Sequence, residues 1–224
     1  MRAATRRAPG GGRRPQRGPG RPPGPSQAVQ IREALIAAAS RQYAAGGRAG
    51  ISFSALGAAV GLRKATVFHY FPTKEALVRA VFEALGASLA ERQQAWFSAS
   101  SQSYAKRLER VVGELVDFYE SDPVHARVIC HGLLEVQHVP AADAEPSLAA
   151  FVGEFIAFLR AGIAAGDFVP GDPAGMMMAI GGVILFEVMI PRAARRAYGR
   201  RGNGARRAEV VAFVCRALVN GGRA

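Results

Sequence analysis

LRKATVFHYFPTKEAL, residues 62–77, contains two of the three lysines of a chain that has 26 arginines. These two, Lys64 and Lys74, stand on either side of four consecutive ring side chains, and Pro72 separates the rings from Lys74. Pro72 is expected to end a helix here, because proline has no backbone N–H and its ring clashes with the preceding turn. We therefore predict a short helix over about 63–70 and a longer helix that starts at Lys74.

The preceding stretch ISFSALGAAVGL, residues 51–62, predicts another short helix. Ser52 can cap it by accepting a hydrogen bond from the free amides of the first turn. Phe53 and Leu56 share one face of this helix, and Gly61 suits the left-handed conformation that often ends a helix. Two short helices joined by a turn of three to four residues that contains glycine form a helix-turn-helix.

The rest of the chain also has a helical pattern. Apolar residues recur every four positions from Ile31 to Tyr43, which predicts an amphipathic helix. Further helices are expected near 103–121, 123–138, 146–165, 173–190 and 205–220. Period-two alternation is scarce. We predict an all-α protein with an N-terminal three-helix helix-turn-helix domain at 27–73 and a larger helical domain at 74–224.

The net charge of +12 is carried entirely by the N-terminal end, because residues 1–80 sum to +12 and residues 81–224 sum to zero. Residues 1–26 contain seven arginines, no acid and almost no apolar side chain, so we expect a disordered arm. This asymmetry favours a polyanionic partner, with nucleic acid ahead of a membrane. A solvated basic surface without a partner is the alternative on charge alone.

Other classes of function find little support. The longest apolar run, 174–186, is shorter than the ~18 residues of a membrane-spanning helix, and Glu187 follows it, so we expect a buried helix and no membrane partner. Cys130 and Cys215 lie far apart and no secretory segment follows the basic start, which favours a reduced, cytoplasmic protein. No phosphate loop or nucleophile elbow is found, so we expect neither an enzyme nor a cofactor.

One expected helix face carries three potential metal ligands. His131, Glu135 and His138 follow a four-then-three spacing, which can bring such ligands together. The helix has no second ligand pair, and polar groups satisfied at a surface or in a pocket explain the pattern as well. We therefore predict no metal site.

The helix expected over 63–70 has two different sides. Val67 is expected to point inward, and the opposite side presents Lys64, Ala65, Thr66 and His69. A helix that enters the major groove of DNA needs a surface that is small at the closest approach and carries donors and a methyl group for base edges. Lys74 lies in a first helical turn, where the macrodipole disfavours a cation but the free amides attract an anion such as phosphate.

Together these residues resemble the DNA-binding domain of the TetR family of transcriptional repressors. The resemblance covers residues 27–80. The positions that match the family pattern in register are Ser52, Leu56, Gly61, Leu62, Thr66, Val67, Phe68, Tyr70, Phe71, Thr73, Lys74, Glu75 and Leu77.

The resemblance implies two sets of contacts with double-stranded DNA. Base edges are expected to meet Lys64, Ala65, Thr66 and His69. Phosphates are expected to meet Ser52, Ser54, Tyr70 and Lys74. The chain departs from the pattern at Arg63, where a capping serine is frequent, so the helix is capped differently or Arg63 itself reaches the DNA. It departs again at Phe68, which replaces a tyrosine, so the phosphate contact of that hydroxyl is lost or moved.

For the larger domain the resemblance implies dimerisation and small-molecule binding. GDFVPGDP at 166–173 is similar to the family's start of the penultimate helix, and that helix and the last one are expected to pair with a second copy. We expect a homodimer with an apolar or aromatic effector. Its candidate contacts are the large apolar side chains Trp96, Phe97, Phe118, Tyr119, Phe151, Phe155, Met177 and Phe186. The stripe formed by Phe151, Phe155 and Phe158 is more typical of a core than of a pocket.

The resulting hypothesis is a homodimeric transcriptional regulator, most simply a repressor that an effector releases from a pseudo-palindromic DNA site. Two alternatives stay open. One is a DNA-binding protein without an effector, of architectural or broad specificity, which would show little sequence preference. The other is an enzyme or metal-binding protein with a vestigial helix-turn-helix, which would retain metal after dialysis against a chelator.

Overall fold

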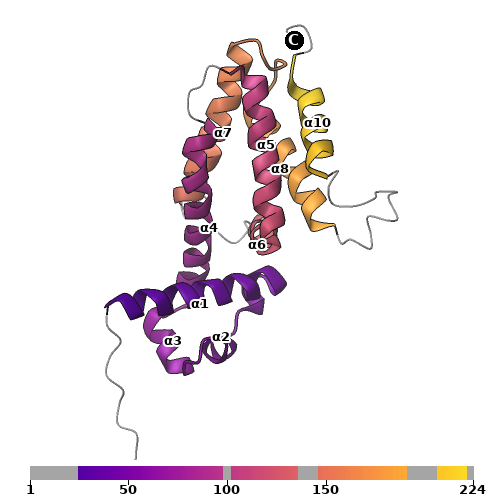
Figure 1. Ribbon diagram of the computed structural model, residues 1–224. Coiled ribbons are helices and arrows are strands. Elements are labelled where there is room, and N and C mark those ends of the chain that lie inside the picture. Colours follow the sequence, from indigo (N-terminus) through magenta and orange to yellow (C-terminus); the bar gives the residue numbers. More distant parts are fainter. Residues whose placement is uncertain (1–24, 98–101, 136–145, 191–205, 221–224) are drawn as a thin grey trace, which may run out of the picture.

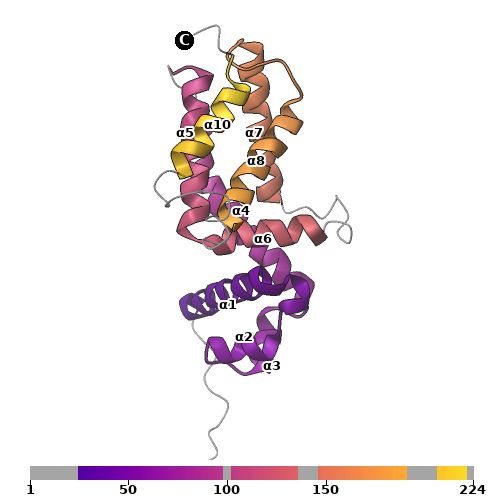
Figure 2. The same cartoon turned by 90° about the vertical axis from the view of Figure 1, so that its right-hand side faces the viewer.

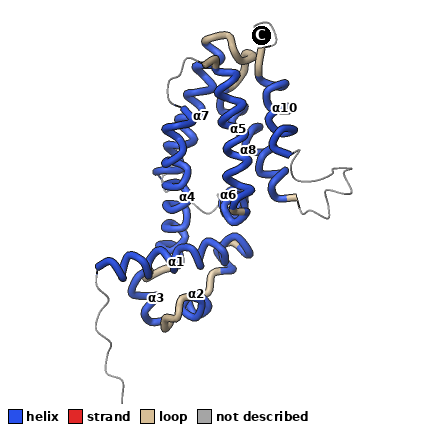
Figure 3. The backbone as a smooth tube through the Cα atoms, in the orientation of Figure 1, coloured by secondary structure: helices blue, strands red, loops and turns tan. Residues whose placement is uncertain are grey.

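The computed structural model describes four parts of the chain, residues 25–97, 102–135, 146–190 and 206–220. Figure 1 shows a small helical unit at one end of the molecule and a taller helical bundle above it. Every regular element in the described ranges is a helix, which Figure 3 shows in blue. The predicted all-α fold is confirmed.

The small unit is a three-helix N-terminal domain. Its elements are α1 (Pro25–Gly46), the short 3-10 helix η1 (Arg48–Gly50), α2 (Phe53–Ala59) and α3 (Lys64–Tyr70). Leu35, Leu56, Val67 and Phe71 form its core, and each is at most 3% exposed. Burial of one such side chain stabilises a fold by about 1.5–3 kcal/mol, so this cluster fixes how the three helices cross.

The first residues of two helices differ from the predicted ones. α1 begins at Pro25, two residues before the predicted domain start, because proline is well suited to the first turn of a helix. Pro25 and Ser26 therefore belong to α1 and not to the predicted arm, and residues 1–24 lie outside the described residues. α3 begins at Lys64, with Arg63 as the residue that precedes it.

The larger domain starts with α4 (Lys74–Phe97), a helix of 24 residues that leaves the N-terminal domain and runs into the bundle. The other helices are α5 (Tyr104–Ser121), α6 (Pro123–Glu135), α7 (Pro146–Ala164), α8 (Pro173–Met189) and α10 (Arg206–Leu218). α7 packs along α4 and α10 along α5, while α6 crosses the foot of the bundle directly above α1 (Figure 2). None of the helices in the described ranges combines the length and apolar character that a membrane crossing needs.

Side-chain caps fix the starts of two of these helices. Thr73 Oγ1 accepts a hydrogen bond from the Ala76 amide at 3.1 Å at the start of α4. The Asp172 carboxylate accepts from two first-turn amides of α8 at 3.2 and 2.9 Å. Each cap satisfies amides that have no partner inside the helix, and such a cap is worth about 1 kcal/mol.

An aromatic cluster fills part of the bundle. The Phe97 ring of α4 lies 6.2, 5.3 and 5.5 Å from the rings of Phe151, Phe155 and Phe158 on α7. The three α7 rings are at most 5% exposed. The Arg107 guanidinium of α5 lies over the Phe158 ring at 5.0 Å and donates to the Phe97 carbonyl at 2.8 Å. The stripe at 151–158 is therefore core between three helices.

A polar contact joins the two domains where α6 meets α1. The Tyr43 hydroxyl donates to Glu135 Oε2 at 2.7 Å, and the Arg48 N–H donates to Glu135 Oε1 at 2.9 Å. The Tyr43 ring is buried and meets Phe82 of α4 and His131 of α6 edge-on at 5.6 and 5.9 Å. Burial and the neighbouring carboxylate raise the pKa of the Tyr43 phenol, so its hydroxyl stays a donor. We call Tyr43, Arg48, Phe82, His131 and Glu135 the domain joint.

The turn between α2 and α3 brings two backbone segments close together. The Leu62 amide donates to the Gly57 carbonyl at 2.7 Å, and Gly61 has a left-handed φ of 71°, as the sequence predicted. A methyl group at Gly57 would lie 2.6 Å from the Leu62 carbonyl oxygen, which is closer than packed atoms approach. Gly57 therefore sets the distance at which α3 follows α2.

Glu135→Gln is expected to lower the free energy of unfolding by about 1–2 kcal/mol, because the amide offers one oxygen to two donors. Urea denaturation followed by circular dichroism measures the change. Glu91→Gln removes the same charge from an exposed position on α4 and should stay within about 0.5 kcal/mol of the parent. Equal effects of the two substitutions would contradict a stabilising joint.

Gly57→Ala is expected to destabilise the protein by about 1–3 kcal/mol, because the added methyl group forces the backbone at Leu62 to move. The matched control is Gly46→Ala at the end of α1, where an added methyl group meets no atom within 4 Å. It should be neutral or slightly stabilising. If both variants unfolded at the same urea concentration, the close approach at Gly57 would not be what spaces α3 from α2.

Candidate nucleic-acid interface

α3 has one buried and one exposed side, as its sequence pattern predicts. Val67 is fully buried, Lys64, Ala65 and His69 are exposed, and Thr66 is half-buried. Together with α2, α3 forms the end of the molecule opposite the C-terminal end (Figure 1). The helix therefore offers an accessible surface with a small centre and polar edges, which a major groove of DNA accepts.

A hollow of about 260 Å³ lies beside the start of α3. It is lined by Ile51, Ser52, Phe53, Ser54, Lys64, Phe68 and Lys74. Four of the nine residues predicted to contact DNA thus come together around one space, although they belong to α2, α3 and α4. None of the seven lining residues is acidic. The hollow therefore presents two ammonium groups and two hydroxyls, all of which can donate to phosphate oxygens.

Local hydrogen bonds and ion pairs position these groups. Ser52 caps α2 by accepting from the Ala55 amide at 3.4 Å, and its own N–H donates to Gln42 Oε1 at 2.9 Å. Glu75, which follows Lys74 in the first turn of α4, forms an ion pair with Arg48 of the joint. The Glu75 carboxylate is thus engaged by Arg48, while Lys74 lines the hollow.

The other five predicted contacts do not line the hollow. Arg63 is exposed and makes no side-chain hydrogen bond to the first turn of α3, so its guanidinium has no capping role. Ala65, Thr66 and His69 lie along α3. Tyr70 is half-buried, and its ring stands edge-on to His69 at 5.8 Å.

Two positioning residues were missed in the sequence. Phe68 is 44% exposed, and its ring centroid lies 4.6 Å from that of Phe53. The Lys64 ammonium lies 5.6 Å from the centre of the Phe68 ring, so the ring forms a cation–π contact with it. Gln42 orients the backbone of Ser52 from α1. Nothing in the local sequence around Gln42 marks it, because its partner lies in another element.

Seven of the eight residues predicted to contact an effector fall into three groups. Trp96, Phe97, Phe151 and Phe155 share the aromatic cluster, Phe118 pairs with Tyr119 at 5.1 Å, and Met177 is half-buried on α8.

Phe186, the eighth of these residues, is 63% exposed in the single chain, so it does not join the buried aromatic cluster. Ile180 and Ile184 occupy the buried side of α8, which leaves Phe186 on its outer side.

Two of the three potential metal ligands considered in the sequence, His131 and Glu135, belong to the domain joint. Glu135 is engaged by the Tyr43 hydroxyl and the Arg48 amide, and His131 packs on the Tyr43 ring. His138 lies outside the described residues. Within the described ranges, no group of three or more His, Cys, Asp or Glu side chains is arranged to hold a metal ion.

Comparisons with known proteins agree with this geometry. Residues 35–81 match the model of the family described as bacterial regulatory proteins, tetR family. A putative transcriptional regulator from Streptomyces coelicolor is 26% identical, with a TM-score of 0.65, and the match covers 82% of this chain and 96% of that chain. A regulatory protein in the tetR family from Rhodococcus RHA1 is 19% identical, with a TM-score of 0.68 and coverage of 85% and 99%.

A third solved structure, a putative transcriptional regulator from Saccharomonospora viridis in complex with choline, is 18% identical, with a TM-score of 0.63 and coverage of 86% and 99%. No curated protein matches the sequence. The family match falls on the elements that carry α3 and the hollow, and the structural matches extend through the larger domain. These relatives are regulators of transcription and not enzymes. Residues 35–81 thus match the tetR family of bacterial regulatory proteins, and the described chain has a fold similar to that of solved transcriptional regulators.

Proposed function

We propose that this protein is a homodimeric DNA-binding regulator of transcription that a small apolar molecule controls. The observation that carries the proposal is the gathering of Ser52, Ser54, Lys64 and Lys74 around one hollow beside the exposed side of α3. Hydroxyl and ammonium donors around an open hollow suit phosphate oxygens, and an exposed helix side with a small centre suits base edges.

With α3 in a major groove, its exposed residues meet base edges. Lys64 donates to acceptors such as those of guanine, and His69 can donate or accept. Ala65 leaves room for close approach and can contact a thymine methyl group. Lys74 and the two serines then meet the flanking phosphates, and Arg63 adds a donor at the start of α3. In a dimer the same set repeats on a second half-site about one helical turn away.

The proposal is tested by fluorescence anisotropy with DNA from upstream of the gene and with a scrambled duplex, between about 50 and 200 mM salt. A preference of at least ~1000-fold for the native DNA supports a specific regulator. Equal binding to several candidate promoters and to the scrambled duplex would favour the alternative, a DNA-binding protein of broad specificity without an effector.

Lys74→Ala is expected to weaken binding to all DNA sequences by a similar factor. It should also reduce the slope of log K against log salt by about 0.9 for each subunit, because one phosphate contact is lost. Lys64→Ala is expected to weaken binding to the preferred site by about 5- to 150-fold and to affect scrambled DNA less, because it removes a base contact. The anisotropy titrations above measure both effects.

The control for these variants is Lys106→Ala, which removes the third lysine of the chain. Lys106 is exposed on α5 and pairs with Glu109 at 2.9 Å. It should leave both the affinity and the salt slope at the parent values. If Lys74→Ala behaved like Lys106→Ala, the hollow would not be a phosphate site.

Exposed apolar side chains on the last two helices support the dimer. Met178 and Phe186 of α8 and Phe213 of α10 are 77%, 63% and 54% exposed. α8 and α10 are neighbours (Figure 2), and we propose that their exposed sides form one dimer surface. A second copy of this region would cover them with two helices from each subunit. An added methyl group at Gly182 would meet no atom within 4 Å, so the backbone there is open to a close partner.

Phe186→Glu is expected to convert the dimer into monomers at micromolar concentration, because it places one unpaired charge from each subunit in an apolar interface. Sedimentation velocity measures the mass. Val29→Glu changes an exposed apolar residue of α1 in the same way and should remain dimeric. A Phe186→Glu protein with the mass of the parent would contradict an interface on α8.

An effector acts in this scheme by shifting the population between two spacings of the recognition helices. The larger domain supplies buried and half-buried apolar and aromatic side chains of the kind that usually line small-molecule sites, among them Trp96, Phe97, Phe155 and Met177. The regulator from Saccharomonospora viridis, solved in complex with choline, supports this role for the fold. α4 is the segment that would carry the shift, because it begins beside the hollow and ends in the aromatic cluster. Repression is the simplest outcome.

A further inference from the structure

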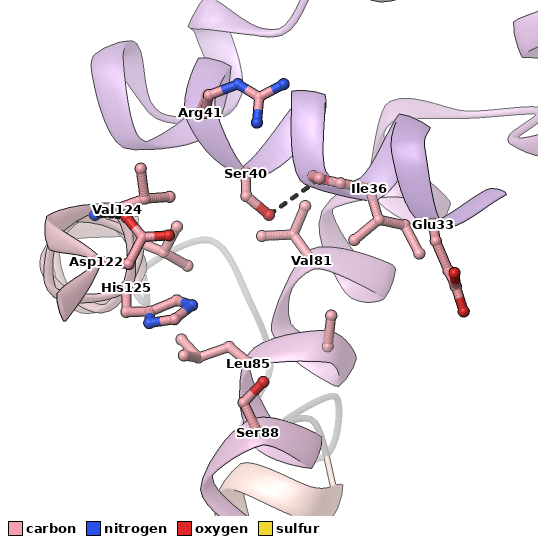
Figure 4. Close-up of a pocket in the computed structure, with 13 residues that line it drawn as sticks. Glu33, Ile36, Ser40, Arg41, Val81, Leu85, Ser88, Asp122, Val124 and His125 are labelled. Atoms are coloured by element: carbon pink, nitrogen blue, oxygen red, sulfur yellow. Dashed lines mark hydrogen bonds between the residues drawn. The ribbon is translucent and has the colours of Figure 1, made fainter. Parts of the chain in front are cut away.

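We infer that the protein has a small-molecule site at the boundary between its two domains, suited to an uncharged compound with an apolar body and a hydroxyl group. A cavity of about 350 Å³ lies there between α1, α4 and α6 (Figure 4). Sites for small molecules have volumes of about 300–1,000 Å³, so this cavity suits a small ligand. None of the eight residues predicted to contact an effector lines it.

The walls of the cavity are apolar and come from both domains. Ile36 belongs to α1, Val81 and Leu85 to α4, and Val124 and Val128 to α6. All except Val124 are buried, so packing fixes these side chains in place. A charged ligand would lose its hydration against such walls, whereas an apolar body gains from burial.

Three uncharged side chains of the lining can form hydrogen bonds with a ligand, namely Ser40, Ser88 and His125. In Figure 4 the His125 ring extends from α6 into the space that α1 and α4 border. Ser40 Oγ donates to the Ile36 carbonyl at 3.0 Å, which leaves it as an acceptor for a ligand. His125 Nδ1 is buried and has no hydrogen-bond partner among the described residues.

The His125 ring is held in one orientation, and its burial favours the uncharged imidazole. It stacks on Phe118 with ring centroids 4.6 Å apart and an angle of 7° between the planes. Burial lowers the pKa of the His125 imidazole below its usual value, although Asp122 acts in the opposite direction. A neutral imidazole has one donor and one acceptor nitrogen. A ligand hydroxyl, which donates and accepts, can therefore bond to the ring in either tautomer.

The charged residues of the lining do not favour an ion. Glu33, Arg41 and Asp122 carry mixed signs. Asp122 accepts a hydrogen bond from the Val124 amide at 3.0 Å. In Figure 4 the charged groups of Glu33 and Arg41 lie away from the His125 ring. An uncharged ligand is thus the class that the centre of the cavity accepts.

An occupant would touch α1 on one side and α6 on the other, close to the domain joint. The bound ligand would therefore favour the arrangement of the two domains in which it contacts α1 and α6 at the same time. This regulatory consequence rests on the proposed function. By linkage, DNA would change the affinity for the ligand by the same factor as the ligand changes the affinity for DNA.

The test uses the full-length protein and ligand-observed NMR titrations. The uncharged probes are phenol and cyclohexanol, and the charged counterparts are benzoate and benzylammonium. Phenol and cyclohexanol are expected to bind with a Kd of about 1 mM or tighter, as is typical of very small ligands. The charged counterparts are expected to bind at least about tenfold more weakly, because they lose hydration at the apolar walls.

Variants locate the binding. Ala84→Phe introduces a ring into the cavity from an exposed lining position on α4 and should abolish binding. Ala87→Phe, at an exposed position of α4 outside the lining, should keep the parent affinity. His125→Phe keeps a ring against Phe118 without the nitrogens and should weaken phenol binding about five- to tenfold. Circular dichroism with urea denaturation shows whether each variant is folded.

Several outcomes would overturn the inference. Parent-like affinity in a folded Ala84→Phe would place the binding elsewhere, and the absence of binding by both uncharged probes would remove the site. Equal binding of benzoate and phenol would refute the ligand class. Specific DNA binding without probe binding overturns this inference alone. If Ala84→Phe abolishes probe binding but the protein shows no preference for any DNA sequence, the site is supported. The proposed function is then overturned instead.

Discussion

The carboxylate of Glu135 determines how the N-terminal domain sits beneath the bundle. It accepts one hydrogen bond from the Tyr43 side chain and one from the Arg48 backbone, so it fixes both the end of α1 and the segment that leads to α2. α1 cannot slide along α6 without leaving the buried Tyr43 hydroxyl unpaired, which costs about 1–3 kcal/mol. The direction of α3 and the shape of the cavity between the domains both depend on this placement.

The recognition helix itself has little intrinsic stability. α3 has seven residues, and an isolated helix of this length is not stable in water. Its conformation is maintained by Val67 and Phe71, which are buried against α1 and α2, and by the short turn at Gly57 and Gly61. The exposed side is therefore free to carry residues chosen for DNA, because the opposite side supplies the stability.

The sequence predicted those features that depend on neighbouring residues. Ser52 caps α2 where expected, Gly61 has the left-handed conformation, and Pro72 lies between two helices. Each of these signals acts within about one helical turn, so a single sequence contains it.

Features that depend on distant residues were not predictable in the same way. The spacing of His131 and Glu135 was considered as a metal pattern, but the partner of Glu135 is a tyrosine 92 positions away. His125 gave no signal, because its importance comes from the stack on Phe118 and from helices α1 and α4. The exposure of Phe186 follows from which side of α8 packs inward, and the apolar pattern of that helix is too uniform to decide this.

The length of α4 gives small movements a large effect at its far end. Its 24 residues span about 36 Å, since each residue of an α-helix adds 1.5 Å. A tilt of about 10° at the end that holds the aromatic cluster displaces the other end by ~6 Å, which is half the ~12 Å width of a major groove. Under the proposed function α4 would act as a lever, because a repacking of one ring in the bundle would shift α3 relative to a DNA groove that does not move.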